Sequence, residues 1–275
     1  MIKIEKCIIC DSEKYEQAFF YESYGFYRCK NCKLLYQPVQ PDLKNTLAIY
    51  NNDYFNYEWE NEMNFFHLIL LGLNDINFFS RYKNIKGTFL DIGCATGLLV
   101  NKMKKSGWDA KGIEICKESA EYGSSKYGIE IINLTLEQAK FPDNYFDIIH
   151  SSHLIEHLND PQIFLKEIYR ILKHDGSLII TTPNNSGLQA IMTKKNWRCI
   201  VKDHLFIFNK KNFSLLLKKN NFLIQNQVSW GGMAKGLVID PIKKILDKSA
   251  KIFNWGDVML FVAQKKISHK KNCLV

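Results

Sequence analysis

The feature that most constrains the fold is a run of short apolar segments that alternate with amphipathic ones from about residue 87 onward. Predicted strands cover residues 87–93, 109–115, 129–133, 146–152, 177–184, 221–230 and 257–266. Predicted helices cover residues 98–107, 117–128, 160–176, 209–220 and 240–253. Asp160 and Pro161 supply an N-cap and a first helical residue. Such alternation implies an α/β fold, a mostly parallel sheet with helices on both faces.

A ligand site is expected where the first predicted strand turns into a helix, since α/β sheets bind ligands at the carboxyl ends of their strands. The stretch Asp91-Ile-Gly93-Cys-Ala95-Thr-Gly97 lies there, and Glu114 ends the next strand. Glycines let a ligand approach the backbone, and an acid at the second strand can accept two ribose hydroxyls. The spacing differs from the dinucleotide pattern G-x-G-x-x-G, and Asp91 would repel a pyrophosphate. A ligand with a cationic end suits this turn.

Two cysteine pairs lie near the N-terminus, Cys7 with Cys10 and Cys29 with Cys32, with 18 residues between the pairs. This spacing is typical of a four-thiolate zinc site. The aromatic, strand-like segment between the pairs is too short to bury a core, so a metal would supply much of its folding energy. Four protein ligands close such a site, and its expected role is structural. Reduced core pairs or a redox dithiol are the alternatives.

Residues 153–157 read HLIEH, which matches the H-x-x-E-H zinc signature of one peptidase class. His153 and His157 would share a face if this segment were helical. The segment can therefore bind a metal, act as a base, or do neither.

Composition and hydropathy limit the cellular location and the kinds of partner that we expect. No apolar run approaches the length of a membrane span, and the first residues lack the apolar core of a secretory signal, so we expect a cytoplasmic protein. The net charge of +9 permits an anionic partner, although the lysines are scattered. The segment 240–253 places Ile242, Ile245 and Leu246 among lysines. We favour a surface helix packed on the sheet, with contact to an anionic membrane as the alternative.

The motifs DIGCATG and GIEI and the segment from FPDNYFDIIHSSHLIEHLNDP to SLIITTPN together resemble the class I S-adenosylmethionine-dependent methyltransferases. The likeness covers roughly residues 40–265 and is nearest to the ubiquinone/menaquinone-type and sugar-modifying branch, many of whose bacterial members carry the double CxxC. It implies a Rossmann-like seven-stranded sheet whose last strand is antiparallel. It also implies three parts: a zinc-ribbon element over 1–39, a helical cofactor-covering segment over 40–86 and a methyltransferase domain over 87–275.

The resemblance also implies which residues bind S-adenosylmethionine. The predicted cofactor-binding residues are Asp91, Gly93, Ala95, Gly97, Glu114, Ile115, Thr135, Leu136 and Tyr54. Thr135-Leu136 stands where many relatives have an Asp that meets adenine, and Ala95 replaces the usual middle glycine. Tyr50 and Tyr54 fit the helix that covers the cofactor.

Methyl transfer to a hydroxyl needs alignment and removal of a proton by a base. The candidates are His153, His204, His157 and Glu156. For Glu156 and His157 we favour a positioning role, because the branch shares them across different acceptors. Trp197, Arg198 and His204 resemble a W…H pattern of relatives in the acceptor-pocket segment. The same four candidates resemble the divalent-ion set of plant small-RNA 2′-O-methyltransferases, with nitrogen ligands better suited to a transition metal than to magnesium.

The resemblance therefore predicts a methyltransferase with a structural zinc ion. Its expected acceptor is a hydroxyl on an anionic small molecule or glycan: a sugar, a nucleotide-linked sugar, or a capsule or lipopolysaccharide component, as in polysaccharide biosynthesis. A quinone precursor or another small metabolite is the alternative. A nucleic-acid-modifying enzyme and a zinc peptidase are further readings; scattered lysines disfavour the first, and DIGCATG with Glu114 disfavours the second.

Overall fold

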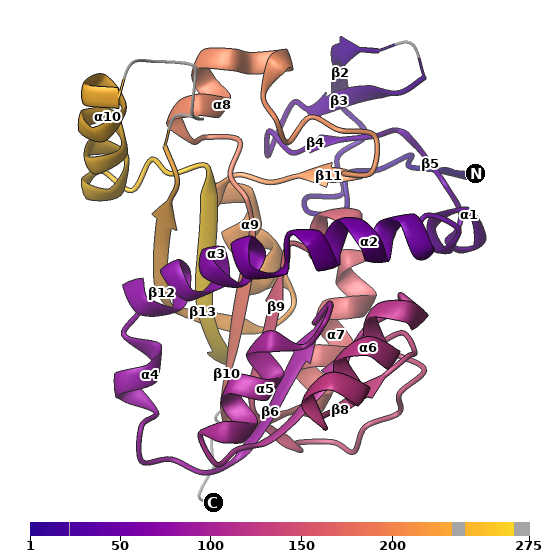
Figure 1. The fold of residues 1–275 in the computed structure, drawn as a ribbon. Helices are drawn as coiled ribbons and strands as arrows, with labels where there is room; N and C mark the ends of the chain where they lie inside the picture. Colours follow the sequence, from indigo (N-terminus) through magenta and orange to yellow (C-terminus); the bar gives the residue numbers. More distant parts are fainter. Residues whose placement is uncertain (22, 233–239, 267–275) are drawn as a thin grey trace, which may run out of the picture.

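A seven-stranded sheet forms the centre of the chain in a computed structural model that describes residues 1–21, 23–232 and 240–266 (Figure 1). From edge to edge the strands are β12 (Phe222–Trp230), β13 (Val258–Lys265), β10 (Leu172–Pro183), β9 (Phe146–Ser152), β6 (Thr88–Ile92), β7 (Asp109–Ile113) and β8 (Glu130–Ile132). Strand β13 runs antiparallel to β10 and β12, and the other neighbours pair in parallel. The predicted α/β class and the antiparallel last strand are confirmed.

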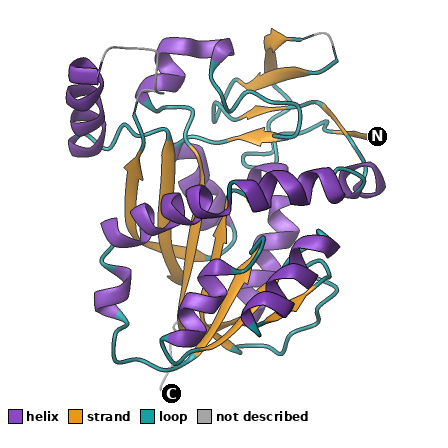
Figure 2. Cartoon of the chain, viewed as in Figure 1, coloured by secondary structure: helices purple, strands orange, loops and turns teal. Residues whose placement is uncertain are grey.

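Helices cover both faces of this sheet, as Figure 2 shows. They are α3 (Glu62–Asp75), α4 (Phe78–Arg81), α5 (Leu98–Lys105), α6 (Lys117–Tyr127), α7 (Pro161–Ile171) and α9 (Lys210–Lys219). Successive strand residues point to opposite faces, so Ile149 joins the buried cluster of α7 and α9 and Ile148 joins that of α3 to α5. Burial on both faces explains why the strands read as continuous apolar runs.

Helix α7 begins as predicted and ends earlier than predicted. Asp160 Oδ1 accepts hydrogen bonds from the Gln162 and Ile163 amides at 2.9 and 3.0 Å, and Pro161 opens the helix. The helix was expected to reach Gly176, but it stops at Ile171. Leu172 is already extended, is fully buried and pairs with Phe146 of β9. Burial of this residue in the sheet outweighs the helical pattern of the sequence around it.

A helical arm crosses the carboxyl ends of the central strands (Figure 1). It consists of α1 (Leu43–Leu47), α2 (Asn52–Glu60) and α3. Helix α2 lies against α6, and α3 lies against β12. At that last contact Gly72 faces the ring of Trp230 so closely that a Cβ would come within 2.3 Å of it.

The N-terminal segment forms a small sheet that continues into a distant part of the chain. Strands β2 (Tyr15–Phe20), β3 (Gly25–Cys29) and β4 (Leu35–Tyr36) are joined by β11 (Phe206–Ile207), in the order β11-β4-β3-β2. A separate pair consists of β1 (Ile2–Lys3) and β5 (Val39–Gln40). We call residues 1–40 the ribbon. It shares its core with the main sheet, because Cys7, Leu34 and Tyr36 lie in one buried cluster with side chains of α7 and α9.

Four further helical elements complete the described part of the chain. They are η1 (Ile155–His157), α8 (Leu188–Thr193), η2 (Lys194–Asn196) and α10 (Asp240–Ile252). In α10 the Ile245 side chain is 66% exposed. The side chain of Ile242, residues 233–239 and the residues beyond Lys266 lie outside the described part of the chain. Within the described ranges, no helix has the length and apolarity that a membrane crossing needs.

Candidate functional site

A cavity of about 1430 Å³ lies over the carboxyl ends of β6, β7 and β9. Helices α1 to α3 and part of the ribbon form its other walls. The cavity brings together residues predicted from the sequence: Tyr50, Tyr54, Asp91, Gly93, Ala95, Glu114, Ile115, Thr135, Leu136, His153, His157 and His204. The predicted cofactor residues other than Gly97 and the predicted base candidates other than Glu156 therefore line one space.

The glycine turn after β6 is held by the carboxylate of Glu114. The Ala95 amide donates to Glu114 Oε2 at 2.9 Å, and the Cys116 amide donates to Oε1 at 2.8 Å. Gly93 and Ala95 both adopt positive φ, 72° and 49°, which brings their amides to this edge. Burial raises the pKa of Glu114, while these amides favour its charged form. The turn and the acid thus form one preorganised unit, with carboxylate lone pairs left for ligand hydroxyls.

Gly97 serves this unit through packing. It is the N-cap of α5 at φ 79°, and a Cβ there would lie 2.5 Å from Ile129 and 2.8 Å from Ile131. Gly97 was predicted to line the cofactor. The structure places it under β8 instead, where only a glycine lets the helix approach the strand.

Asp91 meets a residue that sequence reasoning missed. Its Oδ1 accepts from His150 Nδ1 at 2.6 Å, and both side chains are almost fully buried. His150 sits inside the apolar strand FDIIHSS, where a histidine gives no periodic signal. The pair fixes the Asp91 carboxylate at the floor of the cavity.

Helix α2 supplies a second carboxylate that sequence reasoning missed. The Tyr54 hydroxyl donates to Glu58 Oε1 at 2.8 Å, and Tyr50 packs edge-to-face on Tyr54 with ring centroids 4.8 Å apart. Burial, followed by the charge of Glu114, raises the pKa of Glu58 to about 7. The four-residue spacing from Tyr54 was the available signal for Glu58.

Glu156, His157 and His204 converge in space, and the two histidines line the cavity. Glu156 is 1% exposed, and its Oε2 accepts from the Thr182 hydroxyl at 2.9 Å. The His157 and His204 rings meet edge-on, with centroids 4.7 Å apart. One ligand atom from each of the three residues lies within 4.8 Å of the others. We call these three residues the Glu–His cluster.

Backbone carbonyls fix both imidazoles of this cluster. His157 Nδ1 donates to the Asp203 carbonyl at 2.9 Å, and His204 Nδ1 donates to the Cys199 carbonyl at 2.8 Å. Each ring therefore has a free Nε2 that can accept a proton or bind an ion. Burial lowers the pKa of His204 to about 4. Burial acts against the charge of Glu156, but the three nearby histidines outweigh it and hold the pKa of Glu156 at about 2.

His153 does not share a helical face with His157, because the short turn of the chain here covers only residues 155–157. It has a left-handed backbone at φ 52° and precedes the short η1 turn. Its Nδ1 lies 3.2 Å from Glu156 Oε1, without the alignment of a hydrogen bond. His153 thus reaches the cluster from the solvent side, with 42% of its side chain exposed.

Trp197 and Arg198 occupy different environments. Trp197 is buried, and its Nε1 donates to Asp257 Oδ2 at 3.1 Å. Arg198 lines the cavity, and its Nε lies 3.8 Å from the same oxygen. Trp197 therefore holds the loop, and Arg198 is the member of this pair that a ligand can reach.

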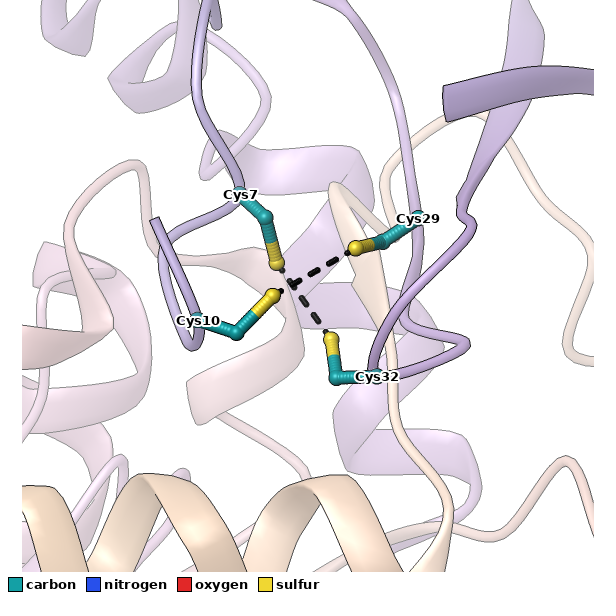
Figure 3. Close-up of side chains that lie close together, drawn as sticks. All are labelled: Cys7, Cys10, Cys29 and Cys32. Carbon is teal, nitrogen blue, oxygen red and sulfur yellow. Dashed lines mark hydrogen bonds between the residues drawn. The ribbon is translucent and has the colours of Figure 1, made fainter. Parts of the chain in front are cut away.

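The four ribbon cysteines converge on one point (Figure 3). Cys7 Sγ lies 3.4 Å from Cys32 Sγ, and Cys10 Sγ lies 3.5 Å from Cys29 Sγ. Zinc–sulfur bonds of about 2.3 Å in a tetrahedron separate sulfurs by roughly 3.8 Å. The hydrogen bond from Cys32 lowers the pKa of Cys7, which favours a thiolate. The donor set and its spacing fit a zinc ion.

Comparison with known proteins identifies related sequences. A family model described as "Methyltransferase domain" matches residues 68–227, more than half of the chain. Ubiquinone biosynthesis O-methyltransferase of Pelagibacter ubique is 32% identical over 155 residues, covering 50% of this chain and 64% of the relative. The mitochondrial enzyme of the same name from Schizosaccharomyces pombe is 22% identical over 232 residues, covering 74% and 81%. The chain thus spans less than two thirds of the length of the first relative.

Solved structures share the fold. An S-adenosylmethionine-dependent methyltransferase from Thermotoga maritima has a TM-score of 0.59 at 20% identity, covering 81% of this chain and all of its own. One from Archaeoglobus fulgidus has a TM-score of 0.55 at 18% identity, covering 77% and 99%. At these identities the likeness shows the fold alone.

Proposed function

The chain belongs to the methyltransferase-domain family, and from that premise we propose that it transfers a methyl group from S-adenosylmethionine to a hydroxyl oxygen of a small molecule. One observation carries the proposal. The Glu114-backed glycine turn and the Glu–His cluster open into the same cavity. A donor and an acceptor bound at its two ends would meet inside it.

The residues at the β6 and β7 end fit S-adenosylmethionine. Glu114 would hold the ribose hydroxyls, Asp91 would face the cationic part, and Ile115 and Leu136 would offer apolar contacts to adenine. When bound, the cofactor supplies an electrophilic methyl group on a sulfonium. Helix α2 would cover it through Tyr54 and exclude water, which strengthens alignment.

The Glu–His cluster would manage the acceptor proton. His204 is neutral in this environment, and its free Nε2 can accept a proton from a hydroxyl held against it. The adjacent Glu156 carboxylate favours the positive charge that forms on the ring. His153 stands at the open side, where it can pass a proton to solvent.

A second reading of the cluster rests on its donor set. One carboxylate oxygen and two imidazole nitrogens within 4.8 Å suit a transition-metal ion better than magnesium. In that case Glu156, His157 and His204 would hold the ion. Its charge would lower the pKa of an acceptor hydroxyl. The ribbon cysteines would hold a separate, structural zinc ion.

For the acceptor we favour a phenolic compound of the quinone-precursor class over a sugar. The named relatives are ubiquinone biosynthesis O-methyltransferases. The acceptor end of the cavity carries apolar side chains, among them Leu158, Ile163 and Phe164. A sugar needs many hydrogen-bond partners, whereas an aromatic ring is satisfied by apolar walls and a few polar groups.

The test is methyl transfer from isotope-labelled S-adenosylmethionine to a panel of catechols and nucleotide sugars, with product detection by mass spectrometry. We expect labelled methyl on a catechol oxygen and none on the sugars. Product on the sugars alone would reverse the acceptor assignment, and no product with any hydroxyl compound would contradict O-methylation.

Variants then assign the cluster. His204→Gln should reduce turnover about 100-fold or more, as loss of a general base does. His174→Gln, which changes an exposed histidine near the start of β10, is the matched control. Turnover lost to a chelator and restored by a transition metal, with the ribbon zinc retained, would favour the metal reading.

A further inference from the structure

Residues Lys202–Leu205 place His204 at the cavity. The backbone carbonyls of this segment are held by a distant part of the chain. The four consecutive carbonyls accept hydrogen bonds from two residues, Gln37 and His157. Gln37 Nε2 donates to the Lys202 carbonyl at 2.6 Å and to the His204 carbonyl at 2.8 Å. The backbone N–H of Gln37 donates to the Leu205 carbonyl at 2.9 Å, and His157 Nδ1 donates to the Asp203 carbonyl. Gln37 therefore binds three of the four.

Gln37 is itself rigidly held by the ribbon. Its side chain is 4% exposed, and its carbonyl accepts from Gln40 Nε2 at 3.2 Å. It directly follows β4, which pairs with β11, so the strand on each side of the contact is fixed. Cys32 lies five residues before it, and the Cys29 amide donates to the Leu34 carbonyl at 2.9 Å. The turn that carries Cys29 and Cys32 is thus followed closely in the chain by Gln37, which binds the His204 segment.

The chemistry of an amide explains the residue type. A single glutamine nitrogen carries two N–H groups that diverge, so one side chain can bind two carbonyls two residues apart. A carboxylate of the same shape has no donor and would repel both oxygens. An apolar isostere would leave both carbonyls without their partner in a largely buried place.

We propose that Gln37 is a positioning residue that sets the place of His204 in the cavity, and that the cysteine ribbon acts on the reaction through it. This inference rests on the proposed function, in which His204 accepts the acceptor proton. The ribbon then contributes more than stability, because its residue Gln37 holds the backbone that places His204 beside Glu156 and His157.

The test uses the full chain with Gln37→Met, which keeps the length of the side chain and removes both donors. Gln162→Met is the matched control. Gln162 Nε2 also joins the ribbon to the main domain, through the Ile8 carbonyl at 2.8 Å, but Gln162 makes no hydrogen bond to residues 202–205. Both variants are measured for zinc content, S-adenosylmethionine affinity and the imidazole nitrogen NMR signals of His204 and His150.

We expect Gln37→Met to shift or broaden the His204 signals and leave those of His150, the zinc content and the cofactor affinity as in the control. With a catechol acceptor, kcat should fall about 10- to 100-fold at nearly constant KM, the range for a displaced catalytic group. Unchanged His204 signals would overturn the proposal, and so would a raised KM at constant kcat, which would make Gln37 an acceptor contact.

The NMR signals need no acceptor, so they separate failure of this inference from failure of the proposed function. If His204 shifts but no hydroxyl compound is methylated, the positioning contact stands and the proposed reaction falls. Should Gln37→Met not fold, Gln37→Asn is measured in its place, since it keeps the amide and draws it back by one methylene. A His204 signal identical to wild type in that variant would equally overturn the proposal.

Discussion

Buried carboxylates define the site at the level of single residues. Asp91, Glu114 and Glu156 are each at most 5% exposed, and each has an assigned donor: His150, two backbone amides, and Thr182. A buried charge is costly unless it is paired and hydrogen-bonded. They lie at the carboxyl ends of three neighbouring strands, the edge at which α/β sheets bind ligands.

Glu114 gives the first residue-level prediction. Glu114→Gln removes the charge and replaces one acceptor oxygen by an NH2 donor, which cannot accept a backbone N–H. The variant should loosen the glycine turn and weaken S-adenosylmethionine binding by tenfold or more, the effect of losing a charged hydrogen bond. Isothermal titration measures this. Glu121→Gln, on an exposed residue of α6, should bind like wild type. Equal affinity in Glu114→Gln and wild type would contradict the cofactor assignment.

Glu58 gives a pH dependence. Its pKa is raised from 4.5 to about 7 by burial and by Glu114, so the folded state holds this proton more tightly than the unfolded state. The stabilisation is complete below pH 4.5 and is lost as pH rises through 7. At about 1.4 kcal/mol per pH unit, the loss amounts to roughly 3 kcal/mol.

Urea unfolding of the ligand-free protein at pH 5 and pH 8 measures this term. Wild type should lose more stability over this interval than Glu58→Gln, which cannot titrate. Glu60→Gln, an exposed neighbour on α2, should behave like wild type. A Glu58→Gln variant with the same pH dependence as wild type would show that Glu58 titrates normally.

Among the elements, α3 makes a close contact with the sheet. Gly72 and Leu73 are its buried residues, and the glycine lies against the Trp230 ring at the end of β12. Because α3 and Trp230 also line the cavity, the fit of this helix sets the shape of the cavity roof.

Gly72→Val tests this contact. The added side chain must displace the Trp230 ring, and overpacking of this kind costs about 1–3 kcal/mol. Denaturant unfolding should show that loss, together with weaker cofactor binding. Asn74→Val introduces the same side chain on the exposed face of α3 and should change stability by less than about 1 kcal/mol. Similar stability of the two variants would mean that α3 is held loosely.

For the whole molecule, the ribbon and the main sheet form one body. Strand β11 from the second half of the chain completes the ribbon sheet, and Cys7 and Tyr36 share a buried cluster with α7 and α9. A shared core predicts that the two parts unfold together.

Cys29→Ser tests this coupling. It should lower the zinc content of the purified protein and the midpoint of a single unfolding transition by more than about 5 °C, since each kcal/mol shifts a chain of this size by about 2–4 °C. Cys116→Ser changes a buried cysteine at the start of α6 and should keep its zinc. Wild-type protein free of zinc would refute the metal site, and two separate transitions would refute the shared core.

The sequence by itself determined the α/β class with its mostly parallel sheet, the position of the glycine turn after the first predicted strand, and the cysteine cluster. Each depends on local rules: apolar periodicity predicts strands and helices, Asp160-Pro161 predicts a helix start, and a CxxC turn presents both thiols on one side. Each of these signals is contained in a few neighbouring residues, so it can be recognised without knowledge of the fold.

Only the tertiary structure decided which side chains meet across the chain. His204 joins Glu156 and His157 because β11 pairs with β4, and Gln37 reaches the His204 segment from 165 and 167 residues away. His150 pairs with Asp91 across neighbouring strands, and Leu172 leaves its helix to fill the sheet. Such contacts depend on strand register and burial, which are properties of the packed chain, and no local pattern encodes them.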